Sequence, residues 1–483
     1  MPERYRINVV PAPGRFHRIG KFGAIDWRED CSRCAECVKL RCCFDVHRHE
    51  TVHNRDSLAS VHTLYECKAC FSCVQGCTKG LLALSVNPEF LEMGDDCWRP
   101  DVIFTTWVQA DTGKIPVSGA GYRGAFHGPG FDSIWTDMSE IVRPTRDGIH
   151  GREYISTSVD IGPKPMRLTF SPDGEILSGA LNLLEVQMPV ILDAPAWPIS
   201  ETALARARAG AAGELKTIAA MSAREAATVS PELLHCVAPI FSSYDIRHRP
   251  DLIESVRKMA FLIDSPDILE SAEAILQVKP EAIISVRINL EPGSVERILE
   301  LSRRGLKVFH LCADRHGRER GEAGKPGRHI KDALRAIHGR IVDERMRDEI
   351  TLIVSGGIAL AEHMAKAIIC GADLVAVDTA LLVALGCRVC RNSHAFYPEV
   401  QQEGSPHGAC PAGIESVDSA YAARRMVNLM GAWHNQLIEV LGAMGIREVR
   451  RLRGETGRAI FMEEIEQEAF GDLLLVSDER ATV

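Results

Sequence analysis

The cysteines of this 483-residue chain have the spacing most closely tied to a known chemistry. Cys67, Cys70, Cys73 and Cys77 follow the pattern C-x2-C-x2-C-x3-C. Thiolates at this spacing hold a cubane iron–sulfur cluster, and the fourth cysteine commonly reaches a neighbouring cluster. A stretched copy precedes this run and contains Cys31, Cys34, Cys37, Cys42 and Cys43. The two runs predict two 4Fe–4S clusters and the transfer of single electrons. A disulfide-rich or zinc-binding segment is the alternative, which the tandem two-residue gaps disfavour.

The first run departs from the usual spacing, and a third group of cysteines lies near the C-terminus. Four residues separate Cys37 from Cys42, one more than usual, so either Cys42 or Cys43 fits as the fourth ligand. The third group is Cys387, Cys390 and Cys410. It predicts a third cluster, either 3Fe–4S or 4Fe–4S with an outside ligand. Coincidental free thiols are the alternative.

Composition narrows the class of protein. With 56 Lys and Arg against 65 Asp and Glu, the net charge of −9 disfavours nucleic acid as a partner. No run of about 18 uncharged apolar residues occurs, so no membrane span is expected. The first residues lack the apolar core of a signal peptide. Sixteen cysteines without such a signal indicate a reducing compartment and hence a cytoplasmic protein.

Eight short apolar runs recur between residues 189 and 386, with helical stretches between them. The runs are residues 190–192, 217–220, 237–241, 260–263, 282–286, 308–311, 352–354 and 374–377. Uninterrupted apolar runs are typical of parallel strands buried on both faces. Eight strand–helix units over roughly 200 residues predict an α/β fold, a (β/α)8 TIM barrel. A doubly wound open sheet is the alternative.

The barrel is one of four predicted parts. We expect a ferredoxin-like 4Fe–4S segment at residues 1–85 and a glycine- and proline-rich connection at 86–188. The barrel follows at 189–386, and residues 387–483 hold the third cysteine group and C-terminal helices.

Two loops at the carboxyl ends of the last predicted strands indicate a phosphate site. Their residues are Ser355, Gly356 and Gly357 after the seventh run, and Asp378, Thr379 and Ala380 after the eighth. Glycines allow close backbone approach, and helix starts offer free N–H groups to an anion. In barrels, these two loops commonly bind phosphate. FMN is the expected ligand because it joins one-electron clusters to two-electron chemistry. Arg287, near the end of the fifth strand, would face the reduced flavin; an ordinary rim residue is the alternative.

These motifs together resemble the glutamate synthase family, and especially its archaeal-type large subunits with an N-terminal ferredoxin-like segment. The resemblance rests on Ser355-Gly356-Gly357-Ile358, Gly371-Ala372-Asp373, Thr379-Ala380-Leu381-Leu382 and the segment from Leu385-Gly386-Cys387 to Cys410-Pro411-Ala412-Gly413-Ile414. It covers roughly residues 31–460. It implies an FMN-binding barrel, iron–sulfur clusters and the reductive amination of 2-oxoglutarate to glutamate.

The chain departs from this family where the oxo acid would bind. The family's G-H-D-G-G-T-G-A stretch after strand six is replaced by residues 313–320, and its K-P-G-x-G-G stretch after strand three is absent from 242–258. We therefore name Arg287, Arg315 and His316 as candidate catalytic or carboxylate-binding residues. An electron-relay subunit with a degenerate oxo-acid site is the alternative function, and an N-methylglutamate synthase-like enzyme is a third.

The sequence also predicts partners. It contains no convincing NAD(P) fingerprint, so electrons are expected from a ferredoxin or an NAD(P)H-oxidising flavoprotein subunit. It contains no N-terminal glutaminase nucleophile, because Pro2 follows Met1, so ammonia would be free or come from a separate glutaminase subunit. We expect an oligomer or a larger complex.

Overall fold

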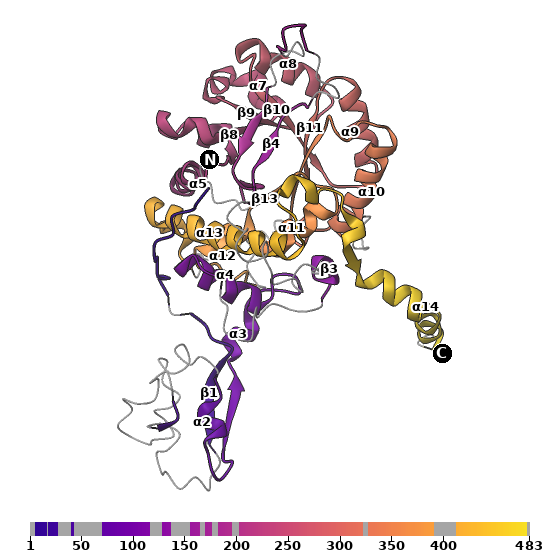
Figure 1. Ribbon diagram of the computed structural model, residues 1–483. Helices are drawn as coiled ribbons and strands as arrows, with labels where there is room; N and C mark the ends of the chain where they lie inside the picture. Colours follow the sequence, from indigo (N-terminus) through magenta and orange to yellow (C-terminus); the bar gives the residue numbers. More distant parts are fainter. Residues whose placement is uncertain are drawn as a thin grey trace, which may run out of the picture.

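A closed barrel of eight parallel strands forms the body of the computed structural model (Figure 1). The structure describes residues 5–16, 18–27, 40–42, 70–115, 128–136, 155–164, 170–175, 182–195, 202–321, 327–390 and 412–480. The predicted (β/α)8 barrel is confirmed, and the open-sheet alternative is excluded because the last strand pairs with the first.

Each predicted apolar run contributes one barrel strand. In chain order the strands are β6 (Val190–Leu192), β7 (Ala219–Ser222), β8 (Val237–Phe241), β9 (Met259–Ile263), β10 (Ile283–Asn289), β11 (Val308–Cys312), β12 (Thr351–Ser355) and β13 (Leu374–Val377). Strands β12 and β13 are buried along their whole length, as expected for strands covered on both faces. In sheet order β6 lies opposite β10, so side chains from distant parts of the chain meet inside the barrel.

Helices between the strands form the outer layer. They are α5 (Thr202–Leu215), α6 (Ala223–Ala226), α7 (Ser243–His248), α8 (Ile268–Val278), α9 (Ser294–Arg303), α10 (Ile330–Asp343), α11 (Ala361–Ile369) and α12 (Thr379–Ala384). Helix α9 shows why they pack there: Ile298 and Leu301 are buried on one face, while Arg297 and Glu300 pair on its polar side.

Two further helices cover the barrel on one side. Helix α13 (Ser419–Ala443) lies beside α5 and α4 (Pro100–Thr112). The buried Arg425 of α13 donates hydrogen bonds to the carbonyl oxygens of Ala12 and Ala384 and pairs with Asp111 of α4. One guanidinium therefore ties the N-terminal arm (residues 5–16), α4 and the end of α12 together.

Short elements complete the described fold. Antiparallel pairs join β1 (Phe22–Trp27) to β2 (Leu82–Val86), β3 (Ile134–Thr136) to β14 (Ala459–Phe461), and β4 (Val159–Ile161) to β5 (Leu184–Val186). The remaining helices are α2 (Ser72–Gln75), α3 (Pro88–Glu92) and α14 (Met462–Arg480), with 3-10 turns at Gly130–Ser133, Pro231–Cys236, Pro250–Ser255, Ile414–Ser416, Val449–Leu452 and Thr456–Arg458. In Figure 1, β1 and α2 lie away from the barrel, and α14 extends from its side. None of the described helices is long and apolar enough to cross a membrane.

Candidate active site

The carboxyl ends of the barrel strands bring a charged pair into the interior. Asp193 directly follows β6, and Arg287 lies in β10 on the opposite side. The guanidinium donates two hydrogen bonds to the two carboxylate oxygens, at 2.7 and 3.1 Å. Asp193 is only 2% exposed. Burial is the largest single influence and would raise the pKa of its carboxyl, but Arg287 and the other groups around it together lower that pKa.

Strand β11 adds two further side chains to this cluster. The His310 ring is fully buried, with Nε2 at 2.9 Å from Ser355 Oγ and 3.8 Å from Asp193. Burial, reinforced by the Arg287 charge, lowers the pKa of His310 to about 3, so this histidine is neutral at pH 7. Cys312, at the end of the strand, interacts electrostatically with Arg287 and Asp193, and burial raises the pKa of its thiol.

The loop after β12 contains Gly356 and Gly357, which the sequence predicts to bind an anion. Gly356 and Gly357 have φ angles of 98° and 68°, a region that favours glycine. Within the described part of the chain, the amides of Gly356, Gly357 and Ile358 donate no hydrogen bond. Consecutive amides in this conformation form an anion-binding nest. The nest fits a phosphate group.

The second predicted loop is less open to an anion. Asp378 follows β13, and its own carboxylate accepts a hydrogen bond from the Thr379 amide at the start of α12. Ala380 follows in the same turn. Burial, with a contribution from Asp193, raises the pKa of Asp378 to about 6. An anion would therefore meet free amides in the β12 loop more readily than at the start of α12.

The two candidates after β11, Arg315 and His316, lie together but are held by a residue outside the barrel. Asp95 Oδ2 is 3.1 Å from Arg315 Nη2 and 2.9 Å from His316 Nε2. The Trp98 indole N–H also donates to the Arg315 carbonyl oxygen, at 2.9 Å. Burial alone would raise the pKa of Asp95, but hydrogen bonds from His316 and the amides of Trp98 and Cys97 lower it to about 2. The segment before α4 thus fixes this loop.

Half of the predicted cluster ligands lie in the described residues. These are Cys42, Cys70, Cys73, Cys77, Cys387 and Cys390. Cys31, Cys34, Cys37, Cys43, Cys67 and Cys410 lie outside the described residues. A Cβ added to Gly76 would approach the Arg41 side chain to 2.6 Å, so the end of the first run lies against the second run. This proximity fits paired clusters.

Backbone hydrogen bonds to sulfur accompany two predicted ligands. The Leu81 amide donates to Cys77 Sγ, and the Val389 amide donates to Cys387 Sγ, both at 3.4 Å. Such bonds tune iron–sulfur clusters. The Gly94 amide also donates to the Arg388 carbonyl oxygen. Gly94 directly precedes Asp95, which holds Arg315. The third cysteine group and the loop after β11 are therefore anchored to the same short segment.

Asp132, Glu362 and His363 also lie close enough to one another to hold a cation. His363 Nδ1 accepts a hydrogen bond from the Ala359 amide, so Nε2 donates to Asp132 at 3.1 Å. The other carboxylate oxygen of Asp132 pairs with Arg99 at 2.6 Å. These interactions show that the three residues form a hydrogen-bonded and ion-paired contact between the connecting segment (residues 86–188) and α11.

Sequence reasoning missed three residues at the site. Asp193 had a signal, because it is a carboxylate placed directly after an apolar run. His310 had a weaker signal, as the only polar residue within the apolar run 308–311. Asp95 had none, because its partners lie 220 residues away in the chain.

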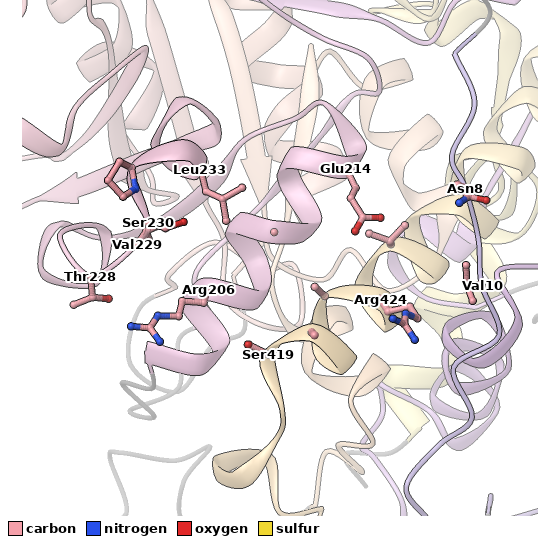
Figure 2. Close-up of a pocket in the computed structure, with 15 residues that line it drawn as sticks. Asn8, Val10, Arg206, Glu214, Thr228, Val229, Ser230, Leu233, Ser419 and Arg424 are labelled. Atoms are coloured by element: carbon pink, nitrogen blue, oxygen red, sulfur yellow. The ribbon is translucent and has the colours of Figure 1, made fainter.

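A groove of about 930 Å³ lies on the outer wall of the barrel, between α5 and α13 (Figure 2). Arg206 and Glu214 come from α5, Arg424 comes from α13, and Asn8 and Val10 come from the N-terminal arm. None of the predicted site residues lines it. The groove is therefore separate from the barrel mouth.

Fold and site together define a (β/α)8-barrel protein with a polar cluster and an anion nest at the carboxyl ends of its strands. Residues 319–447 match the conserved region in glutamate synthase. The chain is similar to the archaeal-type glutamate synthase [NADPH] of Dehalococcoides mccartyi, at 23% identity over 89% of this chain and 93% of the relative. It is 24% identical to that of Archaeoglobus fulgidus over 94% and 97%. The Methanocaldococcus jannaschii protein is 37% identical over 29% and 28%. The sequence resemblance to the glutamate synthase family is thus confirmed. The names of these relatives agree with the prediction of an oxidoreductase.

Solved structures resemble the chain only weakly. A mandelate oxidase variant with an FMN monooxide adduct gives a TM-score of 0.42 at 14% identity, covering 76% of this chain and 93% of that one. A flavocytochrome b2 variant with pyruvate bound gives 0.42 at 11% identity, covering 68% and 76%. Scores below 0.5 are too low to bear on the ligand.

Proposed function

We propose that this chain is an iron–sulfur flavoprotein oxidoreductase of the glutamate synthase type. Electrons enter at clusters held by the N-terminal cysteines and pass to FMN at the barrel mouth. The reduced FMN then serves a reaction at a carbon–nitrogen bond. The observation that carries this proposal is the amide nest at Gly356, Gly357 and Ile358, in the same barrel as Arg287. FMN supplies the exchange between one-electron and two-electron steps.

The residues of the chain have distinct roles in this proposal. The nest at residues 356–358 holds the phosphate. Asp193 orients Arg287 by its two hydrogen bonds, which leaves other guanidinium N–H groups for the flavin. His310 supports the cluster as a neutral hydrogen-bond partner of Ser355. The electron donor is a ferredoxin or an NAD(P)H-oxidising flavoprotein subunit, and ammonia is free or comes from a separate glutaminase subunit.

A flavin assay tests the proposal. The reconstituted protein is reduced, 2-oxoglutarate and ammonium are added, and flavin reoxidation is followed by absorbance. The released flavin is identified by chromatography. We expect FMN, and faster reoxidation with both substrates than in buffer. Release of FAD, or of no flavin, would overturn the proposed cofactor site. FMN without acceleration would exclude 2-oxoglutarate amination.

One observation favours a second candidate, an electron-relay subunit with a degenerate oxo-acid site. Arg315 and His316, which would bind a substrate carboxylate, are both held by Asp95. In that case reduced flavin would pass electrons to a partner protein and would not respond to either substrate.

A further inference from the structure

The third cysteine group lies on a loop whose two ends are in contact. The loop spans residues 385–412 and is described at both ends. A Cβ added to Gly386, which directly precedes Cys387, would lie 3.9 Å from the Ala412 side chain. Ala412 follows Cys410 by two residues in the chain. Cys387 and Cys410 therefore each lie within two residues of the contact between the loop ends.

The first end of this loop is folded around a cysteine sulfur. Val389 has a φ of 49°, a region that is unfavourable for a β-branched side chain. In this conformation its amide donates a hydrogen bond to Cys387 Sγ at 3.4 Å, and Cys387 is only 2% exposed. Backbone strain of this kind persists where the surrounding structure enforces it and is common at functional sites. Amide hydrogen bonds to sulfur are typical of iron–sulfur ligands, so the turn fits a cluster ligand.

Arg15 of the N-terminal arm bridges the place where the loop ends meet. Its Nη2 donates to the Ala412 carbonyl oxygen at 2.5 Å and to the Leu385 carbonyl oxygen at 3.5 Å. Its Nη1 donates to the Gly413 carbonyl oxygen at 3.1 Å. A guanidinium carries five N–H donors in a fixed plane, so one side chain can bind carbonyls from both ends of the loop.

The arm itself is held to α13 by other residues. The Val10 amide and carbonyl oxygen both bond the Asn428 side chain, at 3.1 and 2.8 Å. The Tyr421 hydroxyl donates to the Pro13 carbonyl oxygen at 2.9 Å. None of these bonds involves the cysteine loop. Arg15 therefore extends to the loop from a segment that is fixed independently of it.

We propose that Arg15 is a positioning residue for the predicted third iron–sulfur cluster, because it holds together the two loop ends that lead to Cys387 and Cys410. The inference rests on the proposed iron–sulfur flavoprotein in taking these cysteines as ligands. Closing a loop costs conformational entropy, and a metal site that is already closed does not have to offset that cost when the metal binds. Without Arg15 the loop ends can separate, and the cluster should be lost more readily.

Iron retention after a chelator challenge tests the inference. The full-length holoprotein is incubated with EDTA, desalted and analysed for iron, and electron paramagnetic resonance spectra are recorded oxidised and after dithionite reduction. The wild type should retain about 11–12 iron per chain, of which about 8 belong to the N-terminal clusters. Arg15→Met should retain about 8, with the signals of the N-terminal clusters unchanged. Arg15→Lys, whose single ammonium cannot reproduce the planar fork, should retain an intermediate amount.

Tyr421→Phe is the matched control. It removes the bond to the Pro13 carbonyl oxygen, two residues before Arg15, and leaves the contacts of Arg15 with the loop in place. It should retain as much iron as the wild type. If Arg15 had only a structural role, both variants would lower the free energy of unfolding and neither would lose iron selectively.

Three results would overturn the inference: wild-type iron retention in Arg15→Met, the same iron loss in Tyr421→Phe, or a wild type that holds only about 8 iron. Arg15 is exposed, so Arg15→Met should fold, and circular dichroism checks this. If it does not fold, Arg15→Lys gives the same comparison. Missing FMN or missing signals of the N-terminal clusters in the wild type would count against the proposed function. The iron difference between Arg15 variants and the wild type decides the role of Arg15 separately.

Discussion

Asp193 and Arg287 form a bidentate ion pair between opposite strands of the barrel, β6 and β10. The pair crosses the interior where the substrate end of the barrel would lie. It fixes the Arg287 guanidinium in place and removes its net charge from the site. The pair therefore bears on the stability of the barrel and on the charge of its interior.

Removing one member of this pair should destabilise the barrel strongly. Asp193→Asn leaves the Arg287 charge without its partner in a mostly buried position, and such changes cost about 3–5 kcal/mol. Combining it with Arg287→Gln should recover part of that loss, because no unpaired charge remains. The free energy of unfolding in urea, followed by circular dichroism, gives the coupling from a double-mutant cycle.

An exposed ion pair provides the comparison for this cycle. Arg249 and Asp251 pair at 2.8 Å on the surface, and removing Arg249 should leave the free energy of unfolding nearly unchanged, because water and salt screen an exposed pair. If the unfolding costs of Asp193→Asn and Arg287→Gln simply added in the double variant, the coupling energy of the pair would be zero. That result would contradict its bidentate geometry.

The barrel could be predicted from the sequence because each of its strands coincides with a short run of apolar residues. Runs such as residues 374–377 are buried on both faces and contain only apolar residues, so local pattern and tertiary position agree. The glycine pair after β12 could also be recognised as a loop from the sequence, whereas its positive φ angles and its amides without hydrogen bonds in the described part of the chain come from the structure. Position along the chain then placed them at the barrel mouth.

The sequence did not reveal which charged residues pair with each other across the barrel. Asp193 and Arg287 are 94 residues apart, and only closure of the barrel brings them together. Asp95 reaches the loop after β11 from outside the barrel, over 220 residues. A sequence pattern shows which residues are charged, but long-range packing decides which opposite charge lies next to each of them. For this reason the sequence singled out Arg287, Arg315 and His316 as candidates but did not reveal their pairing with aspartates.

Glycine at position 356 is required by both backbone and space. Gly356→Ala would place a Cβ 2.3 Å from the Asp314 carbonyl oxygen at a φ of 98°. Gly293→Ala is the matched control, because Gly293 has a φ of 96° with nothing within 4 Å of the added atom. The control should cost about 1–2 kcal/mol in unfolding free energy. Gly356→Ala should cost at least about 2 kcal/mol more, since overpacking adds to the backbone term.

Flavin content gives the second readout for these variants. Gly356→Ala should retain less FMN after purification, while Gly293→Ala should retain the wild-type amount. Equal unfolding costs and equal flavin contents would show that the β12 loop tolerates a side chain and is not an anion nest.

Neutral His310 should make the protein sensitive to mild acid. Its pKa is about 3 in the fold, depressed first by burial and then by Arg287, against about 6.5 when unfolded. Between these values the unfolded state binds one more proton, so stability rises with pH and levels off above about 6.5. One such histidine removes about 2 kcal/mol of stability between pH 7 and pH 5.

His310→Gln should flatten this profile. The glutamine amide can still bond Ser355 but takes up no proton, so the loss of unfolding free energy from pH 7 to pH 5 should shrink by about 2 kcal/mol. Urea unfolding at several pH values measures it. His235→Gln, which changes an exposed histidine, is the control and should keep the wild-type profile. An unchanged profile in His310→Gln would mean that His310 is protonated in the fold.

Iron content should separate cluster cysteines from core cysteines. Cys73 lies in α2 within the second run, and Cys73→Ser should lower bound iron by about four per chain, from about 8 for the two N-terminal clusters. Cys236→Ser is the matched control. Its buried thiol donates to the carbonyl oxygens of Ala209 and Leu233, and burial raises its pKa to about 11, so it is a protonated core residue. Iron analysis, with electron paramagnetic resonance of the dithionite-reduced protein, distinguishes the two. Equal iron in both variants would contradict a cluster at the second run, because only a ligand substitution removes metal while a core substitution leaves it bound.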